Sequence, residues 1–381
     1  MRLISCHNAQ NLMPTTKTIT IRRNNFFVCE TTKFMSQSPK TNLKTFHFRN
    51  LHPLIAIGTA SDRYAGWIGQ IYSPDRCQGH ITKRTKVIGG KSFIEEVLPV
   101  DSVVEYFEHF PVLEIDFIFY RPLLDPNGQP NQNYHVLKHY AKHLKEGNRI
   151  ILKVPQMIRA QKIRKGDYHV ANPAYLNPKI CTEQFYEPAV GLLGTNLTGF
   201  IFEQEYHRKE DRAPVIEMAQ GFEKFFSQVP KDSRYHLELR TDLYLRDRVF
   251  EVLAKHGVGQ VLSHWTWLPP LRKQLAKADG RFFNGGKEGV IRLLTALGMR
   301  YEDSYVRAYP FDKLVDGMMA PEMVLETVEI VKAAIEKGVM VNLIVNNRAG
   351  VNAPLIAQEI ATKFLGKPKS ETPYQMNLWD I

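Results

Sequence analysis

Cysteine is scarce in this chain, and long hydrophobic runs are missing from it. The four cysteines, Cys6, Cys29, Cys77 and Cys181, form no CxxC pair and have no metal-ligand spacing. This pattern favours free thiols in a reducing compartment over a disulfide scaffold, so we expect a cytoplasmic protein. No stretch approaches the roughly 20 apolar residues of a membrane span, and we therefore expect no membrane partner.

Motifs that would identify a nucleotide-binding or hydrolytic enzyme are also missing. The sequence has no GxGxxG, HExxH or GxSxG pattern. The run "GGKS" at 89–92 lacks the earlier glycine of a P-loop, because Thr85 occupies that position. These absences count against an open, nucleotide-binding parallel sheet, and they leave the cofactor unknown.

Acidic residues are nearly absent from the first 50 positions, which hold eight Lys or Arg residues and only Glu30 as an acid. This segment accounts for +7 of the formal net charge of +11. It also lacks sustained periodicity, so we expect 1–50 to be a disordered basic extension. Because the charge is concentrated there, total charge is weak evidence for nucleic-acid binding by the folded body.

From residue 51 onward, short apolar runs alternate with amphipathic helical patterns. The predicted strands are 54–59, 112–117, 149–154, 198–203, 235–240, 259–264, 288–294 and 339–347. The clearest predicted helices are 134–147, 213–229, 245–257 and 320–338, the last closed by Gly338. Eight strands alternating with helices predict a (β/α)₈ TIM-type barrel over 51–366, followed by a C-terminal tail at 367–381.

In such a barrel the active site lies at the C-terminal mouth of the strands, so polar residues late in each strand are the first candidates. Period-two alternation puts Glu114 and Asp116 on one face, and likewise Glu238 and Arg240. We take Glu114, Glu238 and Asp116 as candidate acids or bases. The candidate ligand-binding residues are Trp67, Tyr120, Arg121, Lys153, Gln204, Arg240, Arg292, Asn346 and Asn347.

A structural role competes with each of these assignments. A Glu238–Arg240 or Glu114–Lys153 pair can simply form a layer inside the barrel, and Trp67 can either stack on a sugar or cap the core. Buried unpaired charge is too costly to accumulate at most of the strand ends without a ligand or a tight network. We therefore expect a polar site at the mouth.

No metal site is predicted. Glu114 and Asp116 could together bind Mg²⁺ or Mn²⁺, which prefer oxygen ligands, but His264 is the only histidine at a predicted strand end, which counts against a metal site built from a histidine and several acids. The spacing of His135, His139 and His143 would suit a zinc stripe, but lysines beside these residues and an apolar opposite side are typical of an amphipathic surface helix, so we favour a solvated face.

Several segments together resemble the YecE-like family, domain of unknown function 72. They are "IGTASDRYAGWIGQIYSP", "VLEIDFIFYRP", "ILKVPQ", "GFIFEQ", "LELR" and "IVNNRAGVNAPLIAQEIA", and the match covers about residues 54–365. The resemblance implies a TIM barrel loosely related to sugar isomerases, without a settled reaction. The family-like positions are Gly58, Trp67, Glu114, Phe119, Tyr120, Arg121, Lys153, Gln204, Glu238, Arg240, Asn346, Asn347 and Asn352.

This chain also departs from the family pattern. Asp116 stands where the family often has Asn, "EQEYHR" replaces "QLPP", and the segment after Arg292 lacks the usual His. These departures indicate a divergent subfamily whose ligand can differ from that of its relatives.

Three functions are compatible with these residues. The first is binding or transformation of a small polar or anionic metabolite, sugar-like or phosphate-like, at the barrel mouth. The second is a nucleic-acid-binding or nuclease-like barrel, suggested by the aromatic and basic run at 264–277. The third is a non-catalytic barrel that binds a small anion. We favour a small-molecule ligand over nucleic acid, and whether the protein is an enzyme stays open.

Overall fold

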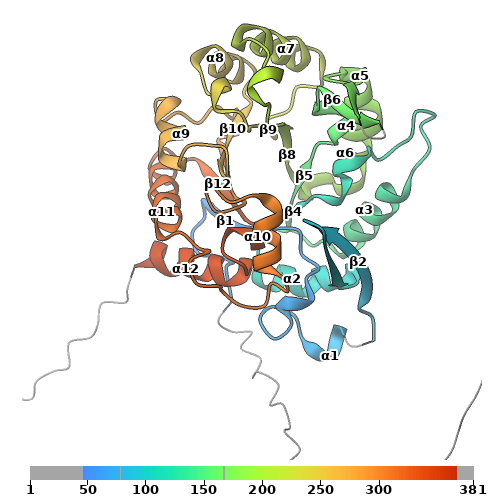
Figure 1. Cartoon of the computed structure of the whole chain (residues 1–381), viewed down its shortest axis with the longest axis vertical. Coiled ribbons are helices and arrows are strands. Elements are labelled where there is room, and N and C mark those ends of the chain that lie inside the picture. Colours follow the sequence, from blue (N-terminus) through green and yellow to red (C-terminus); the bar gives the residue numbers. More distant parts are fainter. Residues whose placement is uncertain (1–45, 78, 166–167, 367–381) are drawn as a thin grey trace, which may run out of the picture. The chain divides into compact units, whose positions relative to one another are not determined.

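The computed structural model describes residues 46–77, 79–165 and 168–366, which form a closed barrel of eight parallel strands. Around the barrel the strands follow the order β1-β12-β11-β10-β9-β8-β5-β4. Helices surround this ring of strands (Figure 1). The strands are β1 (Ile55–Ala60), β4 (Val112–Ile115), β5 (Arg149–Lys153), β8 (Leu197–Gln204), β9 (Tyr235–Leu239), β10 (Gly259–His264), β11 (Glu288–Leu293) and β12 (Met340–Val345). The predicted (β/α)₈ fold is confirmed.

Twelve α-helices lie in the described residues, and local sequence explains their ends. Asn131 caps the start of α3 by accepting hydrogen bonds from the backbone of Asn133 and Tyr134. Gly257 ends α8 with φ of 64°, a left-handed conformation that suits glycine. The helices are α1 (Pro74–Cys77), α2 (Val103–His109), α3 (Gln132–His143), α4 (Gln156–Arg159), α5 (Pro178–Cys181), α6 (Glu187–Leu193), α7 (Val215–Gln228), α8 (Asp247–His256), α9 (Leu271–Lys277), α10 (Tyr301–Ala308), α11 (Pro321–Glu336) and α12 (Ala353–Leu365).

Two antiparallel hairpins are inserted in the loops that follow barrel strands. The first consists of β2 (Thr82–Ile88) and β3 (Lys91–Val97) and follows β1. The second consists of β6 (Lys162–Lys165) and β7 (Tyr168–Ala171) and follows β5. The first hairpin contacts α10, where the Tyr305 hydroxyl donates a hydrogen bond to Glu95. Loops that follow the strands gather at the C-terminal mouth, so this hairpin and α10 build up that mouth.

The ordered body includes residues on the N-terminal side of the predicted boundary at residue 51. Phe48 is buried and stacks on Phe110 with ring centroids 4.6 Å apart. Its backbone N–H donates to the His109 carbonyl, and the Arg49 guanidinium donates to the Phe107 carbonyl. Residues 1–45 of the predicted extension and the predicted tail at 367–381 lie outside the described residues.

The barrel interior has an apolar middle layer between two polar layers. The middle layer is formed by Ala56, Ala60, Val112, Ile151, Ile201, Val261, Val290 and Ile344. Below it, Arg149 pairs with Glu288 at 2.7 Å, and the Asn342 amide donates to the same carboxylate. At Gly58 an added Cβ would lie 1.8 Å from the Val112 carbonyl oxygen, so glycine is needed where β1 meets β4. The upper polar layer faces the mouth and is described below.

Among the described residues, no helix is long and apolar enough to span a bilayer.

Candidate functional site

A network of charged side chains forms the upper polar layer of the barrel. Glu114, Lys153, Glu203, Glu238 and Arg292 lie at or near the C-terminal ends of β4, β5, β8, β9 and β11. Arg240, directly after β9, and Arg159, from α4, complete it. Four cations thus meet three carboxylates in a nearly dry environment. Sequence analysis predicted most of these residues from their positions at strand ends.

Arg292 is the central residue of this network. Its Nε and Nη2 donate to the two oxygens of Glu114 at 2.7 and 2.6 Å, which is the bidentate geometry of a strong arginine–carboxylate pair. Its Nη1 bonds Glu238, which also accepts a 2.5 Å hydrogen bond from Ser263. The candidate acids Glu114 and Glu238 are therefore both held by Arg292.

Glu203 is the second residue of the network at which several charged groups converge. Its Oε2 lies 2.7 Å from Lys153 Nζ and 2.8 Å from Arg240 Nη2. Arg159 approaches Oε1 at 3.3 Å. Two aromatic rings support these cations from the side. Lys153 Nζ lies over the Phe119 ring, 4.3 Å from its centroid. The Arg240 guanidinium lies over the Trp265 ring, 4.9 Å from its centroid.

The pKa values in the network reflect burial opposed by charge. Burial alone would raise the pKa of Glu203, but Arg159, Arg240 and Lys153 outweigh burial and hold the pKa well below its usual range. Glu238 likewise has a lowered pKa, because Arg240 and Arg292 outweigh its burial. Both carboxylates are thus kept ionised at neutral pH, which suits ion pairing better than proton transfer.

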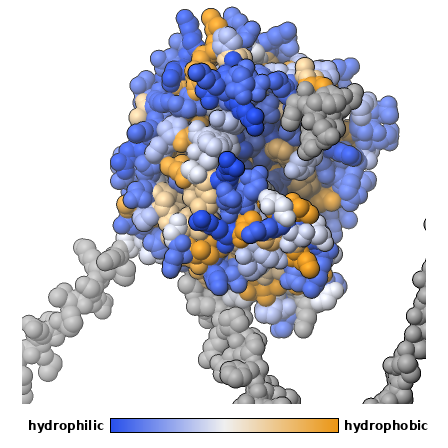
Figure 2. All heavy atoms as spheres, viewed as in Figure 1, coloured by the Kyte–Doolittle hydropathy of each residue, from blue (hydrophilic) through white to orange (hydrophobic). Residues whose placement is uncertain are grey.

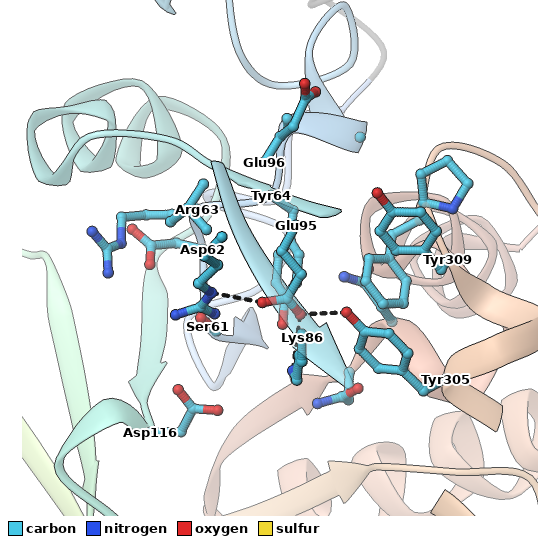
Figure 3. A pocket seen from close by; sticks show the side chains of 18 of the residues that line it. Ser61, Asp62, Arg63, Tyr64, Lys86, Glu95, Glu96, Asp116, Tyr305 and Tyr309 are labelled. Carbon is cyan, nitrogen blue, oxygen red and sulfur yellow. Dashed lines mark hydrogen bonds and ion pairs between the residues drawn. The ribbon is translucent and has the colours of Figure 1, made fainter. Parts of the chain in front are cut away.

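A separate polar cavity lies over the C-terminal ends of β1, β4 and β12. It has a volume of about 450 Å³. Its lining comes from the loop after β1, the β2–β3 hairpin, the turn after β4, the loop after α10 and the turn after β12. In Figure 3, Asp62 and Arg63 lie on one side, Tyr305 and Tyr309 on the other, and Glu95 and Lys86 between them. The space-filling view in Figure 2 shows a mostly hydrophilic face that is hollowed near its middle.

Asp62 is the most unusual carboxylate of this cavity. Only 2% of the residue is exposed. Its Oδ1 accepts a 2.8 Å hydrogen bond from the Tyr140 hydroxyl, and its backbone carbonyl accepts one from Tyr72. Its Oδ2 has no hydrogen-bond partner among the described residues. Burial raises the pKa of Asp62 to about 6, although Arg63 and the Tyr140 bond both favour the ionised form.

The prediction that Asp116 and Glu114 share one face of a strand is wrong. Strand β4 ends at Ile115, and Asp116 leaves the extended conformation with φ of −113° and ψ of −12° to start a 3₁₀ turn at Phe117–Tyr120. Period-two alternation therefore stops before Asp116. Glu114 joins the network inside the barrel, whereas Asp116 lines the cavity, where its charge helps to raise the pKa of Asp62.

The two asparagines after β12 also line the cavity. Asn346 caps the following turn by accepting from the Arg348 backbone N–H at 3.0 Å. The Oδ1 of Asn347 accepts from Trp67 Nε1 at 3.1 Å and from the Ala353 N–H at 2.8 Å. Trp67 is fully buried in the main hydrophobic core, which agrees with the core-capping alternative and leaves its ring no face for a sugar.

Three other candidate ligand-binding residues lie outside this cavity. Tyr120 is 75% exposed, and Arg121 is also exposed. Gln204 is buried, where its Nε2 donates to the Thr241 hydroxyl and its Oε1 accepts from the Arg240 backbone N–H. Gln204 thus supports the loop after β9 rather than facing the cavity.

No group of three or more His, Cys, Asp or Glu side chains suited to a metal ion occurs within the described part of the chain. On α3, His135 and His139 are exposed.

Sequence reasoning missed Asp62, Arg63, Glu95, Tyr140 and Arg159. Of these residues, Asp62 could most easily have been predicted, because an acid two residues beyond a barrel strand belongs to the mouth. Glu95 and Tyr140 lie on an inserted hairpin and on an outer helix, so no strand-end rule could have identified them.

A family model identifies the family of this chain. A family model described as "Protein of unknown function DUF72" matches residues 86–376. A crystal structure of a DUF72 family protein from Enterococcus faecalis aligns with a TM-score of 0.51 at 15% identity, covering 82% of this chain and 96% of that one. A DUF72 family protein from Thermotoga maritima aligns with a TM-score of 0.48 at 14% identity, covering 82% and 99%. No curated protein matches.

Proposed function

This chain belongs to the DUF72 family, whose description names no activity, and we propose from the site itself that it binds a small, hydroxyl-rich polar metabolite at the barrel mouth. The ligand would occupy the cavity lined by Asp62, Asp116, Asn346 and Asn347. Asp116 and the two asparagines are thus retained as candidate ligand contacts. Glu114, Glu238, Arg292 and Gln204 become supporting residues instead.

The observation that carries this proposal is the cavity at the C-terminal ends of β1, β4 and β12. Binding sites of this fold lie at that end of the strands. The cavity's volume of about 450 Å³ falls within the range typical of small-molecule sites. Its lining mixes carboxylates, guanidinium groups, amides and phenol hydroxyls, which suits a ligand that both donates and accepts hydrogen bonds.

A thermal-shift screen tests the proposal, with neutral sugars, polyols, sugar phosphates, nucleotides and divalent cations as probes. Wild type is compared with Asp62→Asn and with Asp316→Asn, an exposed carboxyl outside the cavity. We expect at least one sugar or polyol to stabilise wild type and Asp316→Asn but not Asp62→Asn. If no polyol or sugar stabilises wild type, the proposal is wrong.

A second candidate function is binding of a small anion at the network inside the barrel. Its four cations exceed its three carboxylates. The side chains of Lys153 and Arg240 are 10% and 16% exposed and both approach one oxygen of Glu203, so an anion could join them from the mouth. Stabilisation by inorganic phosphate that disappears in Arg240→Met would favour this function, and equal stabilisation of both proteins would exclude it.

A further inference from the structure

Three aromatic side chains form a platform at the mouth, on the side of the barrel that lies across from the cavity. Tyr206 follows β8, and Trp265 and Trp267 follow β10. The ring of Tyr206 stacks on Trp267 with centroids 5.4 Å apart, and it meets the edge of Trp265 at 6.0 Å. Trp267 is 49% exposed, and the other two rings are half-buried. The platform therefore presents an aromatic face to solvent at the end of the barrel where ligands bind.

Hydrogen bonds in the loops hold this aromatic platform in place. Beside the platform tyrosine, the backbone N–H of His207 donates to the Thr241 hydroxyl at 3.0 Å. Between the two tryptophans, the Thr266 hydroxyl bonds the Thr295 hydroxyl at 3.1 Å. The rings are thus oriented before any ligand binds, which lowers the entropy that binding costs.

Two cations of the charged network reach solvent beside the platform. The Arg240 guanidinium lies over the Trp265 ring, so the network and the platform are in direct contact. The side chains of Arg240 and Lys153 are 16% and 10% exposed, and both approach the same oxygen of Glu203. Nη1 of Arg240 makes no hydrogen bond to a described residue and is not fully buried, so this donor is open to a ligand.

Positive charge is in excess around these two cations. The network has four cations and three carboxylates. Burial lowers the pKa of Lys153, and its arginine neighbours lower that pKa further, although Glu203 opposes them. An anion placed against Arg240 and Lys153 would offset the repulsion among the cations and would accept charge-assisted hydrogen bonds.

We propose that this side of the mouth binds a small organic anion that carries a flat aromatic ring, such as a mononucleotide. The acidic group contacts Arg240 and Lys153, and the ring stacks on the open face of the platform at Trp267. Inorganic phosphate alone would need no aromatic platform, and a neutral ring would need no cations. The contact of Arg240 with Trp265 joins the two halves into one site, which suits a ligand that has both groups.

This inference goes beyond the cavity and its polar ligand. It rests on the second candidate function, anion binding at the network, and it adds the aromatic ring to the chemistry of that ligand.

Isothermal titration calorimetry of the full chain tests the inference with AMP, inorganic phosphate, adenosine and ribose phosphate as probes. AMP has both groups, whereas each of the other probes lacks the ring or the charge. We expect AMP to bind at least about fivefold more tightly than any of the three, because stacking and charged hydrogen bonds then act together.

Substitutions at each half of the site separate the two contributions. Trp267→Ala should weaken AMP binding about fivefold or more and leave phosphate binding unchanged, whereas Trp267→Phe keeps a ring and should retain most of the affinity. Arg240→Met should weaken the binding of both AMP and phosphate by about tenfold or more. Arg248→Met removes an exposed arginine of α8 that pairs with Glu251, and this control should bind like wild type.

The probes also separate this inference from the anion-binding function on which it rests. Equal binding of AMP and phosphate, with no effect of Trp267→Ala, would overturn the inference and leave anion binding intact. Equal binding of AMP and adenosine, with no effect of Arg240→Met, would overturn both, as would the absence of binding by every probe. Binding of single-stranded oligo(dT) without binding of AMP would assign the platform to nucleic acid and also overturn the inference.

Discussion

The barrel mouth contains two polar regions that differ in how their carboxylates are paired. In the network around Arg292, each carboxylate contacts at least one cation, as Glu114 contacts Arg292 at 2.6 Å and Glu203 contacts Lys153 at 2.7 Å. In the cavity above β1, β4 and β12, Asp62 and Asn347 each keep one polar atom without a protein partner. If the ligand binds in the cavity, as we propose, the density of charge is a poor guide to its site.

Removing the centre of the network should have the largest effect on stability. Arg292→Met removes the one cation that bonds both of the buried carboxylates Glu114 and Glu238. We expect the free energy of unfolding to fall by about 3–5 kcal/mol. Urea unfolding at pH 7.5 measures it.

Arg272→Met is the matched control, because Arg272 pairs with Glu329 at 2.6 Å on the exposed surface. Such pairs contribute about 0–1 kcal/mol, so this variant should stay close to wild type. Equal losses in the two variants would contradict the structural role assigned to the network.

In the cavity, removing the charge of Asp62 should raise the free energy of unfolding instead of lowering it. The pKa of Asp62 is raised from 3.8 to about 6, so its contribution to stability is full below pH 3.8 and is lost as pH rises through 6. Asp62→Asn cannot ionise, and at pH 7.5 it should be more stable than wild type by up to about 3 kcal/mol.

Urea unfolding of both proteins between pH 4 and pH 8 checks this expectation. The difference between Asp62→Asn and wild type should grow across the window from 3.8 to 6 and then level off. A difference that does not change with pH would mean that the folded protein holds Asp62 with an ordinary pKa.

A smaller effect is expected where the core meets the cavity. Trp67→Phe removes the indole donor to Asn347 and leaves a small void, which should cost about 1–2 kcal/mol. Weaker binding of a cavity ligand should accompany this loss, because Asn347 is then less firmly oriented. Trp267→Phe changes a residue that is 49% exposed and should be nearly neutral in the same unfolding and thermal-shift assays.

The smallest effect concerns the two carboxylates of the cavity. The charge of Asp116 contributes least among the factors that set the pKa of Asp62. Asp116→Asn should therefore lower the stability midpoint attributed to Asp62 by only a fraction of a pH unit. A shift of the midpoint upward would show that Asp116 is not close enough to act on Asp62 as a negative charge.

The barrel was predictable because its strands are apolar runs that alternate with amphipathic helices, as at 149–154 and 213–229. Strand ends also identified Lys153, Glu238 and Arg292 as residues of the mouth. Which charges pair was not predictable, because Arg292 and Glu114 are 178 positions apart and meet only through barrel closure. The raised pKa of Asp62 depends on burial, and its position depends on Tyr140 from an outer helix, and no local pattern encodes either of them.

Isothermal titration calorimetry tests most directly whether the ligand site is the cavity or the network. The strongest sugar or polyol from the thermal-shift screen is titrated into wild type, Asp62→Asn and Arg240→Met at pH 7.5. We predict that Asp62→Asn weakens binding at least about tenfold, as expected for loss of a hydrogen bond to a charged group, while Arg240→Met stays close to wild type. Full binding by Asp62→Asn together with lost binding by Arg240→Met would contradict the account.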